Sequence, residues 1–182
     1  DVLVLIDYPG FNLRIAEWAR RQGLRVVYYV SPQVWAWKEN RVKKIKRDVD
    51  KMLVILPFEV DFYKKWHYDV TYVGHPLIEV VSDDKKNVPV KPLSDKPVIA
   101  LLPGSRAQEI KVKLPIMLQM VRHFPGYCFA VAQASAQPDS LYKDIIGDLP
   151  VLLVKDETYN LLKQAKAGLI TSGTATLETA LF

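Results

Sequence analysis

The chain has 182 residues, of which 49% are apolar and 25% charged, and its formal net charge at pH 7 is +5. This composition predicts a globular protein of one domain or two small ones, and its positive charge suits a phosphorylated ligand, an anionic membrane surface or nucleic acid. The single cysteine, Cys128, excludes an internal disulfide and is expected to be a reduced core residue. No run approaches the roughly 18 apolar residues of a membrane span, and no signal peptide is recognised.

Short apolar runs alternate with segments of helical spacing along the chain. The predicted strands are residues 2–6, 25–30, 52–56, 70–73, 97–102, 127–132, 151–154 and 167–171. The predicted helical faces are Ile15/Ala16/Ala19, Val42/Ile45/Val49 and Met117/Met120/Val121. Pro115 is expected to be the first residue of the third helix. This alternation predicts an α/β fold with parallel sheets of the doubly wound type.

Residues 82–96 interrupt the alternation. The segment is polar, rich in proline and charge, and long for a loop, so it predicts an interdomain linker between residues 1–81 and 97–182. The chain starts inside a predicted strand and ends inside a predicted helix. We therefore expect it to be a fragment of a longer polypeptide.

Two strand ends carry small-residue turns. The strand at 97–102 runs into Pro-Gly and then Ser105 and Arg106, and the strand at 167–171 runs into Ser172-Gly173-Thr174. Ligands of open α/β sheets bind at the carboxyl ends of strands, where turns and helix N-termini present free N–H groups. The two junctions predict one phosphate-bearing ligand held between them.

A series of motifs, in order and spacing, resembles the lipid-A-disaccharide synthase family. The motifs are Ile6 to Asn12, Val30 to Trp37, Leu56 to Glu59, Val73 to Pro76, Leu101 to Arg106 and Ser172 to Glu178. The resemblance covers nearly the whole chain and implies the two-domain glycosyltransferase fold called GT-B. Both Rossmann-like domains would be incomplete here: residues 1–81 would belong to the N-terminal acceptor-binding domain and residues 97–182 to the C-terminal UDP-sugar domain.

The resemblance also implies a reaction. The family transfers 2,3-diacylglucosamine from its UDP derivative to 2,3-diacylglucosamine 1-phosphate, inverting the anomeric centre, forming lipid A disaccharide 1-phosphate and releasing UDP. It implies a bacterial enzyme without cofactor or metal, peripheral on the cytoplasmic face of the inner membrane. An anionic membrane surface is then an expected partner, and nucleic acid is not.

The expected donor site follows from the same resemblance. Arg106 would give bidentate positive charge to the pyrophosphate, and the turn at Ser172 would give backbone N–H groups. Glu178, about one helical turn beyond Thr174, would accept hydrogen bonds from the ribose hydroxyls. The alternative for Arg106 and Glu178 is a surface or capping role. The expected UDP-binding residues are Ser105, Arg106, Ser172, Gly173, Thr174, Thr176 and Glu178.

The acceptor hydroxyl must lose a proton, which requires a base. Asp7 directly follows the first predicted strand and is the predicted base; its alternative is a turn or capping role. Many family members carry an acidic residue at the position of Gly10, so the glycine leaves that role to Asp7. His75 is an alternative base or a structural turn residue, and Asn12 is predicted to be an N-cap.

Aromatic and basic residues follow the predicted strand at 25–30. The residues expected at the acceptor are Asn12, Gln33, Trp35, Trp37 and His75. The basic segment 38–47 that follows carries a narrow apolar stripe, and such a helix can lie on an anionic membrane. The alternative is a helix that covers the sheet and exposes a basic face.

No metal site is predicted. Asp48-Val49-Asp50 matches the Asp-x-Asp signature of another glycosyltransferase class, but it precedes a predicted strand instead of following one. We interpret both carboxylates as solvated helix-end charges.

Two other functions stay open on the sequence alone. One is a different UDP-sugar enzyme of the same fold, of the UDP-GlcNAc 2-epimerase or peptidoglycan-lipid glycosyltransferase type, which should lack the segment 31–37. The other is a non-catalytic module that binds a membrane or nucleic acid through its basic helix. No nucleic-acid motif is recognised.

Overall fold

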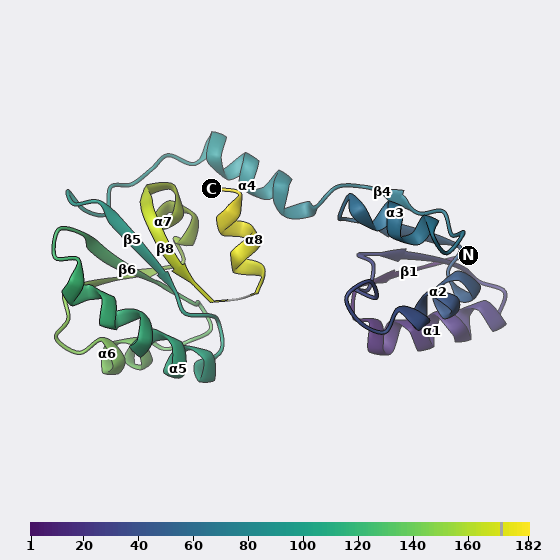
Figure 1. Ribbon diagram of the computed structural model, residues 1–182, viewed down its shortest axis with the longest axis horizontal. Helices are drawn as coiled ribbons and strands as arrows, with labels where there is room; N and C mark the ends of the chain where they lie inside the picture. Colours follow the sequence, from purple (N-terminus) through teal and green to yellow (C-terminus); the bar gives the residue numbers. More distant parts are fainter. Residues whose placement is uncertain (172) are drawn as a thin grey trace. The chain divides into compact units, whose positions relative to one another are not determined.

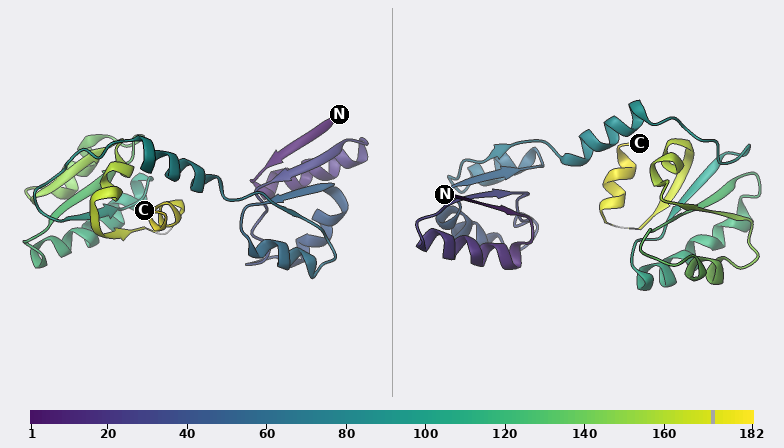
Figure 2. Two further views of the ribbon diagram at one scale, coloured as in Figure 1. Left: turned by 90° about the horizontal axis from the view of Figure 1, so that it is seen from above. Right: turned by 180° about the vertical axis from the view of Figure 1, so that it is seen from behind.

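A computed structural model describes residues 1–171 and 173–182, and the chain divides into two compact units, Asp1–Ile78 and Glu79–Phe182 (Figures 1 and 2). Each unit contains one four-stranded sheet in which neighbouring strands are parallel. The predicted α/β class with two parallel sheets is confirmed, and each unit is consistent with an incomplete Rossmann-like domain of the GT-B type.

The first unit has its strands side by side in chain order. They are β1 (Val2–Ile6), β2 (Arg25–Tyr29), β3 (Lys51–Val54) and β4 (Thr71–Tyr72). The helices between them are α1 (Pro9–Arg21), α2 (Val42–Asp48) and α3 (Phe58–Lys64), with the 3-10 turn η1 (Glu39–Arg41) before α2.

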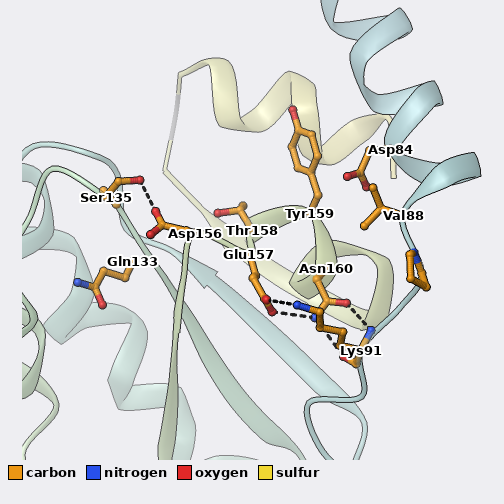
Figure 3. A pocket seen from close by; sticks show the side chains of 12 residues that line it. Asp84, Val88, Lys91, Gln133, Ser135, Asp156, Glu157, Thr158, Tyr159 and Asn160 are labelled. Carbon is orange, nitrogen blue, oxygen red and sulfur yellow. Dashed lines mark hydrogen bonds and ion pairs between the residues drawn. The ribbon is translucent and has the colours of Figure 1, made fainter.

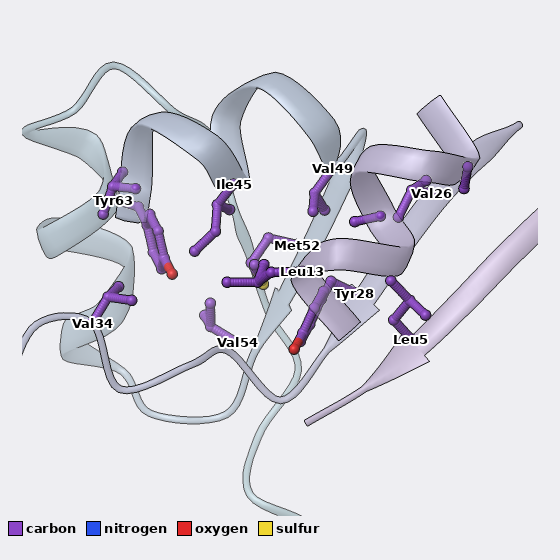
Figure 4. Packing of buried hydrophobic residues seen from close by; sticks show 13 residues of the cluster. Leu5, Leu13, Val26, Tyr28, Val34, Ile45, Val49, Met52, Val54 and Tyr63 are labelled. Atoms are coloured by element: carbon purple, nitrogen blue, oxygen red, sulfur yellow. The ribbon is translucent and has the colours of Figure 1, made fainter. Parts of the chain in front are cut away.

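One face of this sheet is buried and the other is exposed, since successive side chains of a strand point to opposite faces. The buried cluster drawn in Figure 4 joins sheet and helices through residues such as Leu5, Tyr28, Met52, Leu13, Ile45 and Tyr63. On the opposite face of β1, the side chains of Val2, Val4 and Ile6 are all more than half exposed. In this unit the helices therefore pack against a single face of the sheet.

The second unit buries both faces of its central strands. Its strands are β5 (Val98–Leu102), β6 (Cys128–Gln133), β7 (Val151–Lys155) and β8 (Ala165–Ile170), in the spatial order β7-β6-β5-β8. Its helices are α5 (Ala107–Leu118), α6 (Asp139–Ile146), α7 (Thr158–Gln164) and α8 (Thr174–Ala180), with the 3-10 turn η2 (Gln119–His123) after α5.

Two clusters make up the core of the second unit. Leu101 and Val131 pack under α5 and α6, while Ala100 and Leu102 pack with Leu161 of α7 on the other side (Figure 1). Burial on both faces explains why β5 and β6 are continuous apolar runs, as expected of parallel strands. The predicted strands agree with the observed ones to within about two residues at each end.

The segment expected as a linker is partly helical. Helix α4 (Pro76–Asn87) extends through residues 82–87, because that stretch lacks proline, and Pro89 lies just beyond the helix end. The rest of the segment contacts α7: the backbone N–H of Lys91 donates to Asn160 Oδ1 (2.9 Å), and that of Leu93 donates to Gln164 Oε1 (3.0 Å). The segment is thus ordered against the second unit.

Two local expectations were wrong in detail. Helix α5 begins at Ala107, so Pro115 lies inside it instead of starting it. A proline inside a helix removes one backbone hydrogen bond, and burial of Leu114 and Met117 on either side offsets that cost. Cys128 is a free thiol as expected, but it is only half-buried at the start of β6.

Candidate functional site

A pocket of about 450 Å³ lies at the carboxyl ends of β5 and β8 in the second unit, where the two small-residue junctions meet. Its lining residues are Leu102, Gly104, Ser105, Arg106, Glu109, Ala132, Gln133, Ala134, Thr158, Thr171, Gly173, Thr174, Ala175 and Glu178. Of the expected UDP-binding residues, Ser105, Arg106, Gly173, Thr174 and Glu178 are in this set. Thr176 is not in it, and Ser172 lies outside the described residues.

The first junction holds Arg106 beside a carboxylate. Arg106 Nη1 lies 3.0 Å from Glu109 Oε1, and the arginine side chain is 83% exposed. Partial burial would raise the pKa of Glu109, but hydrogen bonds from Arg106 and from the Ser105 backbone outweigh it and hold that pKa below its usual value. The guanidinium is therefore oriented at the pocket rim by an ionised partner, with most of its surface open to a ligand.

Gly104 makes this junction possible. Its φ of +111° is a conformation that side chains rarely adopt, and a Cβ there would lie 2.6 Å from Glu109 Oε2. Any larger residue would displace the carboxylate that orients Arg106.

The second junction leads into α8. Gly173 precedes the helix with a φ of +147°, and the Thr176 hydroxyl donates to the Gly173 carbonyl within the same turn. Thr176 thus stabilises the turn. Glu178 lies farther along α8, and its Oε1 accepts a hydrogen bond from the Tyr159 hydroxyl (3.1 Å).

Thr171 was not among the predicted site residues. Its hydroxyl oxygen is buried at the edge of the pocket and has no hydrogen-bond partner among residues 1–171 and 173–182. The available signal was its position, since Thr171 is the last residue of the predicted strand 167–171 and directly precedes the small-residue junction.

A second pocket of about 440 Å³ adjoins the first and shares Gln133, Ala134 and Thr158 with it. Figure 3 shows its side chains, with Ser135 hydrogen-bonded to Asp156, and Lys91 paired with Glu157 (2.7 Å). The shared residues make the two pockets neighbours along the carboxyl ends of the strands.

In the first unit, the end of β1 presents Asp7. Asp7 and Tyr8 both have a positive φ (47° and 45°), and the Asp7 side chain is exposed. The Asp7 carbonyl accepts hydrogen bonds from the Tyr28 hydroxyl (2.5 Å) and from Asn12 Nδ2 (2.8 Å). Burial, and secondarily the Asp7 charge, raise the pKa of Tyr28, so its phenol stays a donor. The backbone is thus fixed while the carboxylate is open to solvent.

The N-cap prediction for Asn12 is wrong. The N-cap position of α1 is Tyr8, and Asn12 lies in the first turn, where Nδ2 also donates to the Ile6 carbonyl (3.0 Å). The motif places Pro9 at the start of the helix, which shifts the helix upstream of Asn12.

The expected acceptor residues of segment 31–37 are on the surface. Gln33 is exposed, and Trp37 is 59% exposed with Lys38 Nζ 5.1 Å from its ring centroid. The Trp35 ring packs edge-on against Phe58 at 4.9 Å. The Trp35 side chain is therefore held by packing, and the segment exposes aromatic side chains to solvent.

Glu59 is the buried group beneath this segment. It is 1% exposed and accepts a hydrogen bond from the Leu56 N–H (2.9 Å). Burial raises its pKa, against the lowering effect of hydrogen bonds from Leu56, Trp35 and Ser31. Ser31 in turn shares a hydrogen bond with the Tyr63 hydroxyl (2.8 Å). The motif ending in Glu59 was recognised in the sequence, but no role was assigned to this side chain.

Glu59 makes a pH-dependent contribution to stability. Because its pKa is raised in the folded state, the unfolded state loses its proton first, and the free energy of unfolding falls as pH rises from about 4.5 through the raised value. We expect Glu59→Gln to abolish this part of the slope in urea unfolding. We expect Glu59→Leu to cost about 1–3 kcal/mol, because it leaves the Leu56 N–H without its acceptor.

Glu17→Gln is the matched control. A hydrogen bond from Lys44 lowers the pKa of Glu17, so its contribution is present above the unfolded pKa and is lost as pH falls. The two glutamine variants should therefore change the slope of stability against pH in opposite directions. A slope that Glu59→Gln leaves unaltered contradicts the assignment.

The remaining predicted residues have structural partners. His75 Nδ1 accepts the backbone N–H of Leu77 (3.2 Å) at the start of α4, which is the turn role given as its alternative. Asp48 is buried and paired with Arg47 (2.6 Å), so it is not a solvated charge. Asp50 is exposed, and it accepts the Val26 N–H (2.7 Å). Among the residues described, no group of three or more His, Cys, Asp or Glu side chains is arranged to hold a metal.

The basic helix α2 covers the sheet. Val42, Ile45 and Val49, which form its apolar stripe, are buried in the core of the first unit. The stripe is therefore not available to insert into a bilayer, and the interpretation as a sheet-covering helix is the correct one. Within the described part of the chain, none of the helices has the length and apolar character that a bilayer crossing requires.

Comparison with known proteins gives a consistent result. A family model described as lipid-A-disaccharide synthetase matches residues 1–182. The chain is 42% identical to the lipid-A-disaccharide synthase of Trichlorobacter lovleyi, 43% to that of Syntrophus aciditrophicus and 39% to lipid-A-disaccharide synthase 1 of Legionella pneumophila. Each alignment covers 100% of this chain and 50% of the relative, so the chain spans about half the length of the curated relatives it matches.

Proposed function

Because the chain belongs to the lipid-A-disaccharide synthetase family, we propose that it is part of an inverting glycosyltransferase of lipid A biosynthesis. The proposed donor is UDP-2,3-diacylglucosamine and the proposed acceptor is 2,3-diacylglucosamine 1-phosphate. The products are lipid A disaccharide 1-phosphate and UDP. The observation that carries the proposal is the pocket that brings Arg106 and Glu178 together at the carboxyl ends of β5 and β8.

The donor half of the reaction is assigned to this pocket. When the bond between the anomeric carbon and the UDP oxygen breaks, negative charge builds up on the pyrophosphate, and Arg106 stabilises it. Glu178 accepts hydrogen bonds from the ribose hydroxyls, and Ser105, Gly173 and Thr174 contact the phosphates. No redox cofactor is required, because UDP departs with the bonding electron pair and no electrons are exchanged with another group.

The acceptor half is assigned to the first unit. The acceptor hydroxyl oxygen attacks the anomeric carbon from the side opposite UDP, which inverts the centre, and the Asp7 carboxylate takes the hydroxyl proton. The exposure of this carboxylate above a hydrogen-bonded backbone supports the role. Trp35, Trp37 and Gln33 are assigned to the acylated acceptor, with Asn12 holding the end of β1.

The proposed location is the cytoplasmic face of the inner membrane, as a peripheral protein. The apolar stripe of α2 is buried, so the proposed contact with anionic lipid is electrostatic and aromatic, through exposed Lys43 and Lys46 and the Trp37 ring. Cosedimentation with vesicles should require anionic lipid and decrease with salt. Equal binding to neutral vesicles at high salt contradicts this part of the proposal.

The test of the donor assignment is calorimetric titration with UDP, with GDP as the control nucleotide. The pocket is expected to bind UDP at least about tenfold more tightly than GDP, a difference of about 1.4 kcal/mol. The titration is made on this chain and on a polypeptide of the relatives' full length. Failure of both to bind UDP, or equal binding of GDP, contradicts the proposal.

A further inference from the structure

Glu178 has a neighbour that holds one of its two carboxylate oxygens. Tyr159, in the first turn of α7, donates its hydroxyl to Glu178 Oε1 at 3.1 Å. The two residues are 19 positions apart and belong to different helices. Tyr159 lines the second pocket and Glu178 the first, so this hydrogen bond joins the walls of the two. Figure 3 shows the Tyr159 side chain extending toward the helix that carries Glu178.

The tyrosine is itself held in place. Its ring is half-buried and lies 5.1 Å from the ring of Phe182, centroid to centroid. Burial, and then the hydrogen bond to Glu178, raise the pKa of the Tyr159 phenol, so the hydroxyl keeps its proton at neutral pH. A protonated phenol beside a carboxylate is a donor to it.

We propose that Tyr159 is a positioning residue, which orients the Glu178 carboxylate toward the ribose hydroxyls of a uridine nucleotide. The proposal rests on the donor-site assignment made above. The hydrogen bond from the phenol holds Oε1 and restricts rotation of the carboxylate, and Oε2 is left to accept from a ligand diol. A side chain ordered in advance loses less conformational entropy on binding than a free one. The Tyr159 hydroxyl thus acts on the ligand only through Glu178 and touches no substrate atom.

The proposal predicts a loss that depends on the ribose hydroxyls. Tyr159→Phe keeps the ring and its packing on Phe182 and removes only the hydroxyl. We expect it to weaken UDP binding about 5- to 10-fold, the scale of one ordinary net hydrogen bond, in calorimetry of the full-length protein. Binding of 2′,3′-dideoxy-UDP, which lacks the diol, should be unchanged. In a Glu178→Gln background, Tyr159→Phe should cause little or no further loss.

Tyr127→Phe is the control, because Tyr127 is an exposed tyrosine of the same unit that also packs against a phenylalanine. Tyr127→Phe should leave the affinity for UDP and the affinity for 2′,3′-dideoxy-UDP unchanged. If wild-type protein binds UDP and Tyr159→Phe binds it equally well, or loses the same factor for UDP and the dideoxy analogue, the positioning role is refuted while the donor site stands. If wild-type protein does not bind UDP, both proposals fail together.

Discussion

Replacing Asp7 by asparagine is expected to lower kcat by about 100-fold or more in a polypeptide of the relatives' full length, the loss typical of removing a general base. The amide cannot take the acceptor proton. The fold should survive, because asparagine tolerates the positive φ at this position, and the hydrogen bonds at Asp7 are made by its backbone. The carbonyl accepts from Tyr28 and Asn12, and the N–H donates to the Tyr29 carbonyl. The measurement is the rate of UDP release with both substrates saturating.

Asp69→Asn is the matched control, since Asp69 is another exposed aspartate of the first unit. It should leave kcat within a few-fold of the parent. An Asp7→Asn variant with near-parental kcat would remove Asp7 from the role of base, whereas a raised KM with unchanged kcat would assign it to acceptor binding.

Arg106→Ala is expected to reduce kcat/KM by roughly 150-fold, which corresponds to about 3 kcal/mol of lost transition-state stabilisation. The side chain is 83% exposed and its ion pair is with Glu109, so its removal should cost little stability. Arg106→Lys keeps the charge but loses the bidentate geometry, so its kcat/KM should lie between those of the parent and the alanine variant.

Arg122→Ala serves as the control, because Arg122 is an exposed arginine of the same unit that does not line the 450 Å³ pocket. Both kcat/KM and the affinity for UDP should be measured for each variant. If neither changes in Arg106→Ala, the guanidinium does not act on the pyrophosphate, and the surface role given as its alternative is correct.

The sequence was sufficient to predict the strands of both sheets, but it did not predict where some helices begin and end. Apolar runs such as 97–102 and 127–132 are long enough to predict buried parallel strands without any partner information. Helix limits depend on single residues whose effect is decided by packing. Pro115 was expected to start a helix, but buried neighbours keep it inside α5, and residues 82–87 are helical despite a composition typical of a linker.

Candidate site residues that belong to one short motif could be predicted from the sequence. Contacts between residues far apart in the chain could not. The two small-residue junctions are local features, and they line one pocket. The hydrogen bonds of Tyr159 with Glu178 and of Ser31 with Tyr63 join residues 19 and 32 positions apart. Such pairs have no signature in a single sequence, because neither residue type nor spacing marks them.

The two units have hydrophobic clusters without a residue in common, one from the first 78 residues and the others from the second unit. Heat should therefore melt the chain in more than one step, and no single Tm would describe it. A nucleotide bound at the strand ends of β5 and β8 would shift the melting of its own unit upward by mass action and leave the other melting step where it was. Calorimetric scans resolve the two steps, so the unit that a substitution weakens can be identified from the step that moves.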